Sequence, residues 1–396
     1  MQDGASGERR FGLDWLRIGA FALLILYHIG MFFVPWEWHV KTGRPQEWLE
    51  LPMLALNPWR LALLFVVSGV ASRVLLARMA GPRAFAALRS RRLLIPLAAG
   101  MILFVAPQPW AQLREQTGYA QGFWHFWTRD YFEFGDSRGL VLPTWNHLWF
   151  VAYLWLYTMA LALLAGLPPA ARATVQRAFE RLFEGWRLPW LPILFLWLLR
   201  VGLYPAFGET HALLDDPYAH AFYGAAFFFG VGLARADRLW PRLVSGWQRA
   251  AWLALAGYGA IVLLDLTIAG ESGPAELLAA RLARSVQAWA TILALLGFAQ
   301  RHLHRDGPAR RYLTEAIFPW YIAHQTIIVL AGHWLRPLGL GPGAEFAIIL
   351  AATVTGCAAT YEIGRRIAWL RPLLGLRPAG KRATGQAPPV AAAPAP

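Results

Sequence analysis

Residues 11–34, FGLDWLRIGAFALLILYHIGMFFV, are an apolar stretch about as long as a helix needs to cross a bilayer. Two ionisable side chains, Arg17 and His28, are set into it eleven residues apart. Eleven helical steps return to within roughly 20° of the starting direction and rise about 16 Å, so both side chains share one helix face. Phe21 and Leu24 lie between them on roughly the same face.

Titratable groups in hydrocarbon are costly and normally face the interior of a helix bundle or a watery cavity. We therefore expect Arg17 and His28 to line a path between two compartments, with Asp14 one turn before Arg17. The structural alternative is that Arg17 extends to the lipid headgroups and His28 makes only a structural hydrogen bond.

The composition is that of a polytopic membrane protein. The 396 residues are 57% apolar and 15% charged, with 21 Trp and a mean hydropathy of +0.39. The net charge of +14 comes from short clusters between apolar segments, which favours membrane topology over nucleic-acid binding as its cause. The single cysteine, Cys357, excludes an intrachain disulfide and a cysteine-based metal site, and we expect no metal.

The apolar segments predict an all-α fold of about ten transmembrane helices. We expect no signal-peptide cleavage after the first segment, which we interpret as a retained helix. The predicted spans are 12–34, 59–77, 91–108, 147–166, 189–205, 219–234, 249–269, 281–299, 312–331 and 344–363.

Basic residues alternate between the loops. One set of loops, which includes both ends of the chain, holds 25 of the 37 basic residues, and the other set holds six. Because positive loops stay in the cytoplasm, we expect both termini there. Residues 1–376 form one transmembrane domain in this prediction, and the Pro- and Ala-rich segment 377–396 is a disordered tail. The aromatic loop 109–146 could form an interfacial belt or a lid.

Three histidines reach a similar depth in the half of the bundle that we predict to face outward. They are His28, His147 in PTWNHLWF and His324 in FPWYIAHQTIIVL. Imidazole can take a proton from a hydroxyl near neutral pH, so the three predict a site for general-base chemistry. Arg60, at the outer start of the second span, joins this group, and Ser68 lies two turns deeper.

Each of these residues also has a structural interpretation. His147 could cap a helix or belong to an aromatic belt, and Arg60 could extend to the headgroups. Ser68 and Gly69 could form a notch of small residues for close helix packing, which is the interpretation we favour for Gly69.

Arg89, Arg91 and Arg92 directly precede the third span on the predicted cytoplasmic side. They could be ordinary topogenic charges, or Arg89 and Arg92 could bind phosphate through their guanidinium groups. Together with Arg17, they would then form a cytoplasmic entry for a phosphorylated donor.

Several of these features, in this order, resemble the membrane acyltransferase 3 family. They are Arg17-x10-His28, LLFVVSG in the second span, Arg89-x-x-Arg92, HLWF at 147–150, Tyr321-x-x-His324 and the final YEIGRRIAWLRPLLGL. The last of these is similar to the branch that includes the periplasmic-glucan biosynthesis proteins C. The resemblance spans roughly residues 11–376.

The resemblance implies a multi-pass protein of the bacterial inner membrane that uses a cytoplasmic acyl-CoA donor, such as acetyl-CoA or succinyl-CoA. It implies transfer of the acyl group to a carbohydrate or lipid-linked acceptor on the outer face. It also implies that His28 and Arg17 are essential and that Arg89 and Arg92 contribute. Many members carry a glutamate after the tryptophan of LWF where this chain has LWFVAYLWLY, so no role for that acid carries over.

These observations lead to the hypothesis of O-acyl transfer across the membrane. The donor phosphates would bind Arg89, Arg92 and Arg17, and His28 would act as a base or carry the acyl group itself. His147, Asn146, Arg60 or His324 could orient the acceptor or stabilise the oxyanion, and Ser68 is a further candidate for substrate binding.

Two other classes of protein use comparable residues. The first is a transporter or flippase, which would be expected to show internal repeats and broken midplane helices. The second is the unrelated membrane-bound O-acyltransferase type, which would need its His and Asn at other places in the chain.

Overall fold

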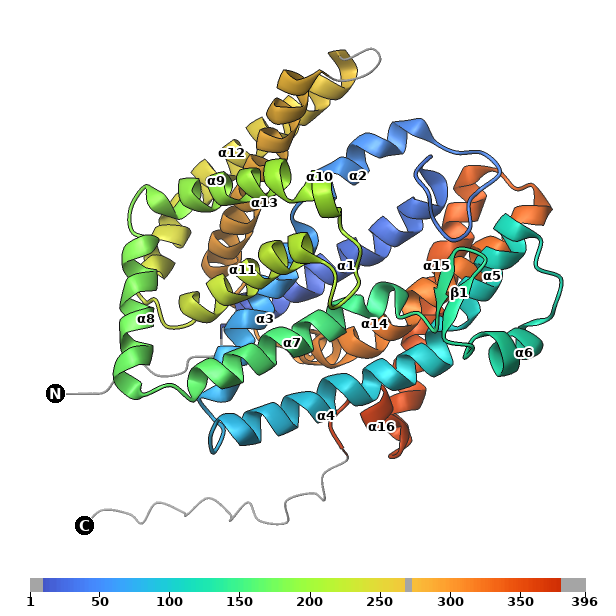
Figure 1. Ribbon diagram of the computed structural model, residues 1–396, viewed down its shortest axis with the longest axis horizontal. Helices are drawn as coiled ribbons and strands as arrows, with labels where there is room; N and C mark the ends of the chain where they lie inside the picture. Colours follow the sequence, from blue (N-terminus) through green and yellow to red (C-terminus); the bar gives the residue numbers. More distant parts are fainter. Residues whose placement is uncertain (1–9, 268–272, 379–396) are drawn as a thin grey trace, which may run out of the picture.

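The computed structural model describes residues 10–267 and 273–378, which are almost entirely helical (Figure 1). The main helices, in chain order, are α1 (Phe11–Phe33), α2 (Glu50–Leu56), α3 (Arg60–Leu76), α4 (Pro82–Gly100), α5 (Pro107–Thr117), α6 (Phe123–His125), α7 (Trp149–Ala165), α8 (Pro169–Leu182), α9 (Arg187–Gly202), α10 (Tyr204–Phe207), α11 (Pro217–Leu233), α12 (Leu239–Thr267), α13 (Pro274–His302), α14 (Pro308–Leu335), α15 (Pro342–Arg366) and α16 (Leu370–Leu373).

Short turns and one hairpin complete the described chain. The 3-10 turns are η1 (Glu47–Leu49), η4 (Asn146–Leu148) and η5 (Arg336–Leu338), and the π-helical turns are η2 (Met101–Val105) and η3 (Phe126–Asp130). Strands β1 (Gly135–Ser137) and β2 (Leu140–Leu142) pair antiparallel, with Asp136 opposite Val141.

Within the described residues, eight helical segments are long and apolar enough to cross a membrane. They are Phe11–Phe33, Glu47–Leu76, Pro82–Thr117, Asn146–Ala165, Arg187–Phe207, Leu239–Thr267, Pro274–His302 and Pro342–Arg366. The predicted all-α membrane class is thereby confirmed. The two remaining predicted spans coincide with α11, which has 17 residues, and α14, which carries arginines, a glutamate and two histidines. The count of ten spans stays a prediction.

The helices extend beyond the predicted spans. α12 begins at Leu239, ten residues before the predicted 249, and the helix predicted at 91–108 begins at Pro82 and continues through η2 into α5. Hydropathy detects only the apolar part of a helix, whereas helical hydrogen bonding continues through its arginine-rich first turns. Residues 268–269 of the seventh predicted span and 379–396 of the predicted tail lie outside the described residues.

The bundle is held together by close helix pairs, among them α1 with α14, α4 with α7, and α12 with α13. α3 and α11 approach most tightly where two glycines meet. A Cβ on Gly69 would lie 2.0 Å from the carbonyl oxygen of Phe227, and one on Gly230 would lie 2.0 Å from that of Val66. The interpretation of Gly69 as a packing notch is confirmed.

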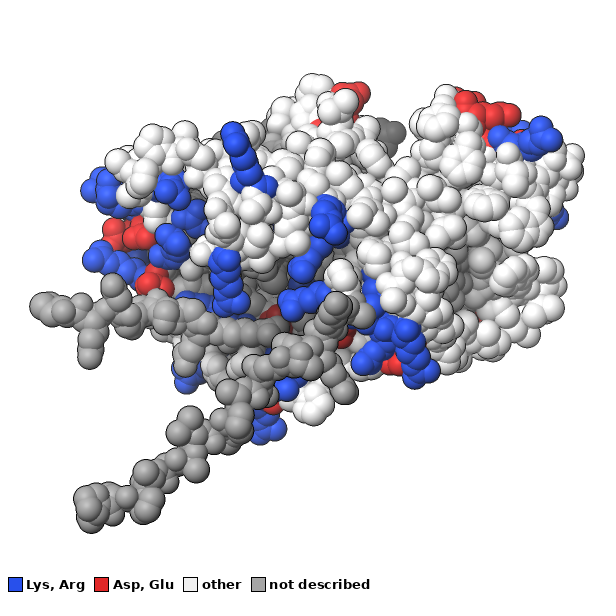
Figure 2. All heavy atoms as spheres, turned by 90° about the horizontal axis from the view of Figure 1, so that it is seen from below, with Lys and Arg blue, Asp and Glu red and all other residues white. Residues whose placement is uncertain are grey.

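The helix ends and their connections gather at two opposite ends of the bundle. At the first end, the start of α1 lies close to the connection after α11 and to the connection between α13 and α14. Arg10 lies 4.0 Å from Asp237, Trp15 donates to the carbonyl of Arg305, and Gln176 donates to the carbonyl of Gly232. We call this the basic end. Figure 2 shows basic side chains, here arginines, gathered over the region of α8, α4 and α16, whereas much of the opposite part is free of charge.

At the opposite end, segments 36–57, 108–147, 208–216 and 333–345 meet. The loop predicted as a belt or lid, 109–146, folds here into α5, α6 and the β1–β2 hairpin. It has its own small core around Phe126 and Tyr131, and the Tyr131 hydroxyl donates to the carbonyls of Met101 and Thr144. This segment covers the opposite end of the bundle on the right of Figure 1.

Both ends of α1 are fixed by ionic groups. At the basic end, Asp14 forms an ion pair with Arg310 of α14, whose side chain is only 1% exposed. At the other end, the Lys41 ammonium donates to the carbonyls of Met31 and Val34, which the last turn of the helix leaves open. Burial lowers the pKa of Lys41 to about 8. The helix that carries Arg17 and His28 is therefore held at two points.

Candidate functional site

His28 and His324 meet between α1 and α14. His28 Nδ1 lies 2.8 Å from His324 Nε2, and the two ring planes are within 8° of each other. Near-parallel planes let an N–H on one ring point at the in-plane lone pair of the other. Phe21 packs edge-on against His324 at 5.8 Å, as expected for a residue on the same face of α1.

The hydrogen-bond partners assign the tautomers of this pair. His324 Nδ1 lies 2.8 Å from the carbonyl oxygen of Tyr321 and 3.2 Å from that of Trp320. A carbonyl can only accept, so Nδ1 of His324 carries the proton and its Nε2 is an acceptor. His28 must then donate from Nδ1, which leaves Nε2 of His28 with a free lone pair. A neutral imidazole in this form can act as a base.

His147 joins the cluster through the same carbonyl. Its Nε2 lies 3.0 Å from the Tyr321 oxygen and 3.2 Å from that of Ile322, so Nε2 donates. The Tyr321 oxygen thus accepts from His147 and from His324, whose rings lie 5.1 Å apart. The Tyr321 hydroxyl returns a hydrogen bond to the carbonyl of His147. The predicted convergence of the three histidines is observed.

Arg60 is buried beside this cluster and does not extend to the membrane surface. Its side chain is 7% exposed, its guanidinium lies 3.4 Å from the centre of the Tyr27 ring, and Nη1 donates to the carbonyl of Asn57 at 3.3 Å. Its charge acts on the neighbouring His28. Arg60 therefore supplies a fixed positive charge at the edge of the histidine cluster.

Asn146 belongs to a network of amides beside the histidines, on the side of the opposite end of the bundle. Its Nδ2 donates to Gln108 Oε1 at 2.9 Å, and Gln325 Nε2 donates to the same oxygen at 3.1 Å. Gln108 donates in turn to Thr326 at 2.7 Å, and Gln325 contacts His39 at 3.0 Å. This network connects the start of α7 to α5, to α14 and to the segment after α1.

The amide network was missed in the sequence because its members are scattered over four segments. The one available signal was the pair of adjacent polar residues, Gln325 and Thr326, directly after His324 in an otherwise apolar run. Gln108 is 0% exposed inside the third predicted span, which is where an uncompensated amide would be costly.

Arg17 lies on the same side of α1 as His28 and also faces α14. Its Nη2 donates to the carbonyl oxygen of Thr314 at 3.4 Å. α1 therefore directs both polar side chains at one partner helix: Arg17 towards its basic end and His28 eleven residues further along. The expectation that both groups turn inward is confirmed, and a conduit along this face stays a prediction.

Arg89 and Arg92 lie one turn apart on α4 at the basic end. The charge of Arg89 interacts with those of Arg92 and Arg17, and Arg92 interacts with Arg377. The Nε atom of Arg89 is buried and has no hydrogen-bond partner. In the described part of the chain, no carboxylate forms an ion pair with Arg89 or Arg92. A bound anion would reduce the electrostatic repulsion between these guanidinium groups.

Ser68 is partly buried on α3, next to Gly69 at the contact with α11. Within the described residues no hydrogen bond joins Ser68 to the histidines, so its role in substrate binding stays a prediction.

Comparison with known proteins identifies the family. A family model described as an acyltransferase domain, acyltransferase 3, matches residues 10–362. The chain belongs to acyltransferase family 3. The match includes α1 with Arg17 and His28, the arginines of α4, and the helix that carries His324.

Curated relatives of this acyltransferase include proteins called glucans biosynthesis protein C. The one from Escherichia coli O6:K15:H31, strain 536, is 28% identical over 147 residues, which are 37% of this chain and 36% of the relative. Those from strains SMS-3-5 and O1:K1 are 27% identical over the same length and the same shares. The similarity thus spans about a third of the relatives' length. No solved structure matches the chain.

Proposed function

We propose that this member of the family transfers an acyl group from cytoplasmic acyl-CoA to a hydroxyl of a carbohydrate acceptor outside the cytoplasm. The observation that carries the proposal is the hydrogen-bond chain from the Tyr321 carbonyl through His324 to His28. It leaves a lone pair on Nε2 of His28 on the inward face of α1.

In the proposed reaction, Nε2 of His28 takes the proton of the acceptor hydroxyl while the hydroxyl oxygen attacks the carbonyl carbon of the thioester. The C–S bond then breaks, and the sulfur of coenzyme A leaves with the proton that His28 returns. During the reaction His28 carries a positive charge, and the Nδ1–H of His28 points at the lone pair of His324. This orientation stabilises the charged ring as it forms.

Two groups near the histidines are suited to the negative charge that develops on the thioester oxygen. Arg60 supplies a buried guanidinium, and Asn146 supplies the amide N–H that its hydrogen bond to Gln108 does not use. Buried donors of this kind stabilise an oxyanion strongly, because water does not compete with them. We assign them to the oxyanion or to the acceptor hydroxyls.

The cluster of Arg89, Arg92 and Arg17 is the proposed site for the donor phosphates. It lies at the basic end, and the histidine cluster lies further along α1 towards the opposite end. The separation of about 16 Å between Arg17 and His28 along the helix suits an extended pantetheine arm. The proposed donor is acetyl-CoA or succinyl-CoA, and the proposed location is the bacterial inner membrane.

The similarity to glucans biosynthesis protein C supports a glucan as the acceptor. The polar amides beside the histidines, at the end away from the arginines, are compatible with a sugar at that side of the membrane.

His28→Ala tests the proposal. We expect acyl transfer in membranes to fall by roughly 10²–10⁴-fold, the usual contribution of a general base, with normal membrane insertion. Leu26→Ala is the matched control, because Leu26 lies on the same helix with its side chain 41% exposed to the surroundings of the bundle. Mass spectrometry of cell-envelope glycans gives the readout. Near-normal transfer by His28→Ala would refute the role of His28, and relocation of an unmodified glycan would favour a transporter.

A further inference from the structure

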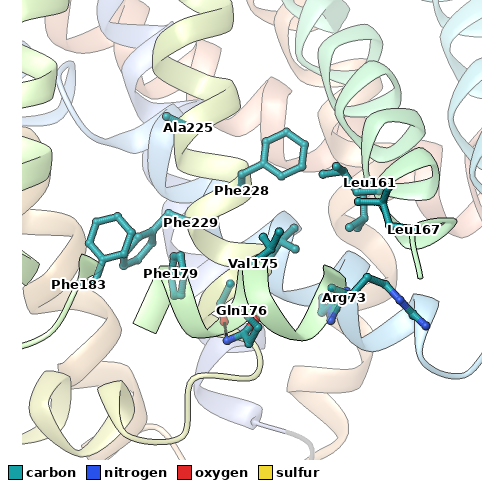
Figure 3. Close-up of a pocket in the computed structure, with 14 residues that line it drawn as sticks. Arg73, Leu161, Leu167, Val175, Gln176, Phe179, Phe183, Ala225, Phe228 and Phe229 are labelled. Carbon is teal, nitrogen blue, oxygen red and sulfur yellow. Dashed lines mark hydrogen bonds between the residues drawn. The ribbon is translucent and has the colours of Figure 1, made fainter. Parts of the chain in front are cut away.

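An apolar cavity of about 320 Å³ lies at the basic end, and neither a histidine nor Arg89 is among the residues that line it. Its walls come from α7, α8 and α11, with the end of α3 at its edge (Figure 3). Phe179, Phe228 and Phe229 point into this space with Val175, and Gln176 and Arg73 lie at its lower edge. The lining is suited to a hydrocarbon chain.

α8 has the properties of a helix that lies in the membrane surface. None of its side chains is buried, and it runs across the ends of α7 and α11 at the left of Figure 1. Phe179 packs against Gly232 of α11, where a Cβ would lie 2.6 Å from the ring, and Gln176 donates to the carbonyl of Gly232 at 3.1 Å. α8 thus covers the cavity at the basic end of the bundle.

The mouth of the cavity is positively charged. Arg73 and Arg172 line it, and the charge of Arg73 interacts with those of Arg172 and Arg235. The Nε atom of Arg73 is buried without a hydrogen-bond partner. No acidic residue is among those that line the cavity, and within the described residues none of these three arginines forms an ion pair.

We propose that this cavity binds one anionic phospholipid, with its phosphate on Arg73 and Arg172 and an acyl chain among the phenylalanines. Basic pockets between transmembrane helices at the cytoplasmic side are suited to such headgroups. An anionic headgroup is favoured over a zwitterionic one because two cations, Arg73 and Arg172, line the cavity and no lining carboxylate is present for an ammonium group. The proposal does not depend on the acyl-transfer reaction.

A neighbouring cavity offers further apolar space for a lipid acyl chain. It has a volume of about 340 Å³, lies between α9 and α11, and shares Phe183, Ala225 and Phe229 with the first. Its lining is apolar throughout, and Trp289 closes one side. The two cavities are therefore neighbours separated by shared wall residues, and only the first has arginines in its lining.

The test uses the delipidated full-length protein in neutral detergent, with native mass spectrometry to measure bound lipid. Phosphatidylglycerol and phosphatidylcholine with identical chains are compared. We expect one phosphatidylglycerol to bind preferentially, and Arg73→Gln with Arg172→Gln to weaken it about thirtyfold, because each arginine beside an anionic headgroup contributes roughly fivefold. Arg177→Gln with Arg181→Gln is the matched control, since these exposed arginines are on α8 but do not line the cavity.

Further measurements distinguish a bound lipid from a bound soluble anion. Ala225 lines both cavities, so the larger side chain of Ala225→Phe should reduce their volume and weaken phosphatidylglycerol binding. Inorganic phosphate or coenzyme A should not displace the lipid. Arg172→Gln alone, at an exposed position, should weaken binding about fivefold and serves if the double variant does not fold. Equal binding of the two lipids, equal loss in the control, or displacement by inorganic phosphate would overturn the proposal.

Discussion

At the scale of single residues, an oxygen of the main chain determines which ring nitrogen of His28 carries the proton. The Tyr321 carbonyl fixes His324, and His324 fixes His28. No carboxylate takes part in this series of hydrogen bonds among the described residues, whereas an aspartate orients the histidine of a Ser-His-Asp triad. We therefore expect His324 to act as a positioning residue, because its Nε2 accepts the hydrogen bond from Nδ1 of His28.

Replacing His324 tests this role. We expect His324→Leu to lower kcat roughly tenfold to hundredfold, part of what a general base contributes, with little change in KM for the donor. His324→Gln keeps an oxygen that can accept from Nδ1 of His28, so it should retain more activity than His324→Leu. The two variants are compared by steady-state acyl transfer and its pH profile. Equal loss in both would contradict the acceptor role.

Part of this site was predictable from the residues. The arithmetic of the helix placed Arg17 and His28 on one face, because helical periodicity does not depend on the partner. The similar depth of His28, His147 and His324 followed from the order of the spans. Their pairing did not follow, because the direction of each hydrogen bond depends on which helices are neighbours. Arg310, the partner of Asp14, was missed for the same reason and appeared only as a loop charge.

At the scale of helices, the contact between α3 and α11 depends on glycine. Gly69→Ala would place a methyl group 2.0 Å from the Phe227 carbonyl oxygen, which is main chain and cannot turn aside. We expect a loss of at least about 1–3 kcal/mol in stability, as for other overpacked sites, measured as a lower melting temperature in detergent. Gly259→Ala on α12 meets nothing within 4 Å and should be neutral or slightly stabilising. Similar melting temperatures for the two variants would contradict this account.

The connection between α13 and α14 carries a second prediction at this scale. Hydrogen bonds from Arg311 and then Arg310 hold the pKa of Asp306 well below its usual value. A carboxylate with a lowered pKa stabilises the fold above its unfolded pKa, and this contribution is lost as the pH falls towards the lowered value. Asp306→Asn should therefore destabilise the protein at neutral pH and reduce the dependence of its melting temperature on pH in the acid range. An unchanged acid profile would contradict the prediction.

Helix boundaries were less predictable than helix positions. α12 starts ten residues before the predicted span because its first turns contain arginines, which hydropathy scores as loop. The loop 109–146 was recognised as aromatic, but its fold depends on contacts such as Tyr131 to Met101, which no local pattern specifies.

At the scale of the whole molecule, the two ends of the bundle should face different compartments. The alternating charge of the loops predicts that the basic end is cytoplasmic. In a Cys357→Ala background, Leu214→Cys, at a position 97% exposed at the opposite end, should react with an impermeant maleimide in cells with a permeabilised outer membrane. Arg177→Cys on α8, at an exposed position that does not line the cavity, should react only after lysis. Labelling of Arg177→Cys before lysis would reverse the assigned orientation.

The shared carbonyl of Tyr321 has a consequence for mutagenesis. Substituting Tyr321 removes a phenol, but every replacement keeps the peptide oxygen on which two imidazoles converge. A scan of single substitutions would consequently leave this acceptor out of its map of essential groups. Only an edit of the polypeptide backbone itself, such as an ester in place of the amide, would expose what that atom contributes.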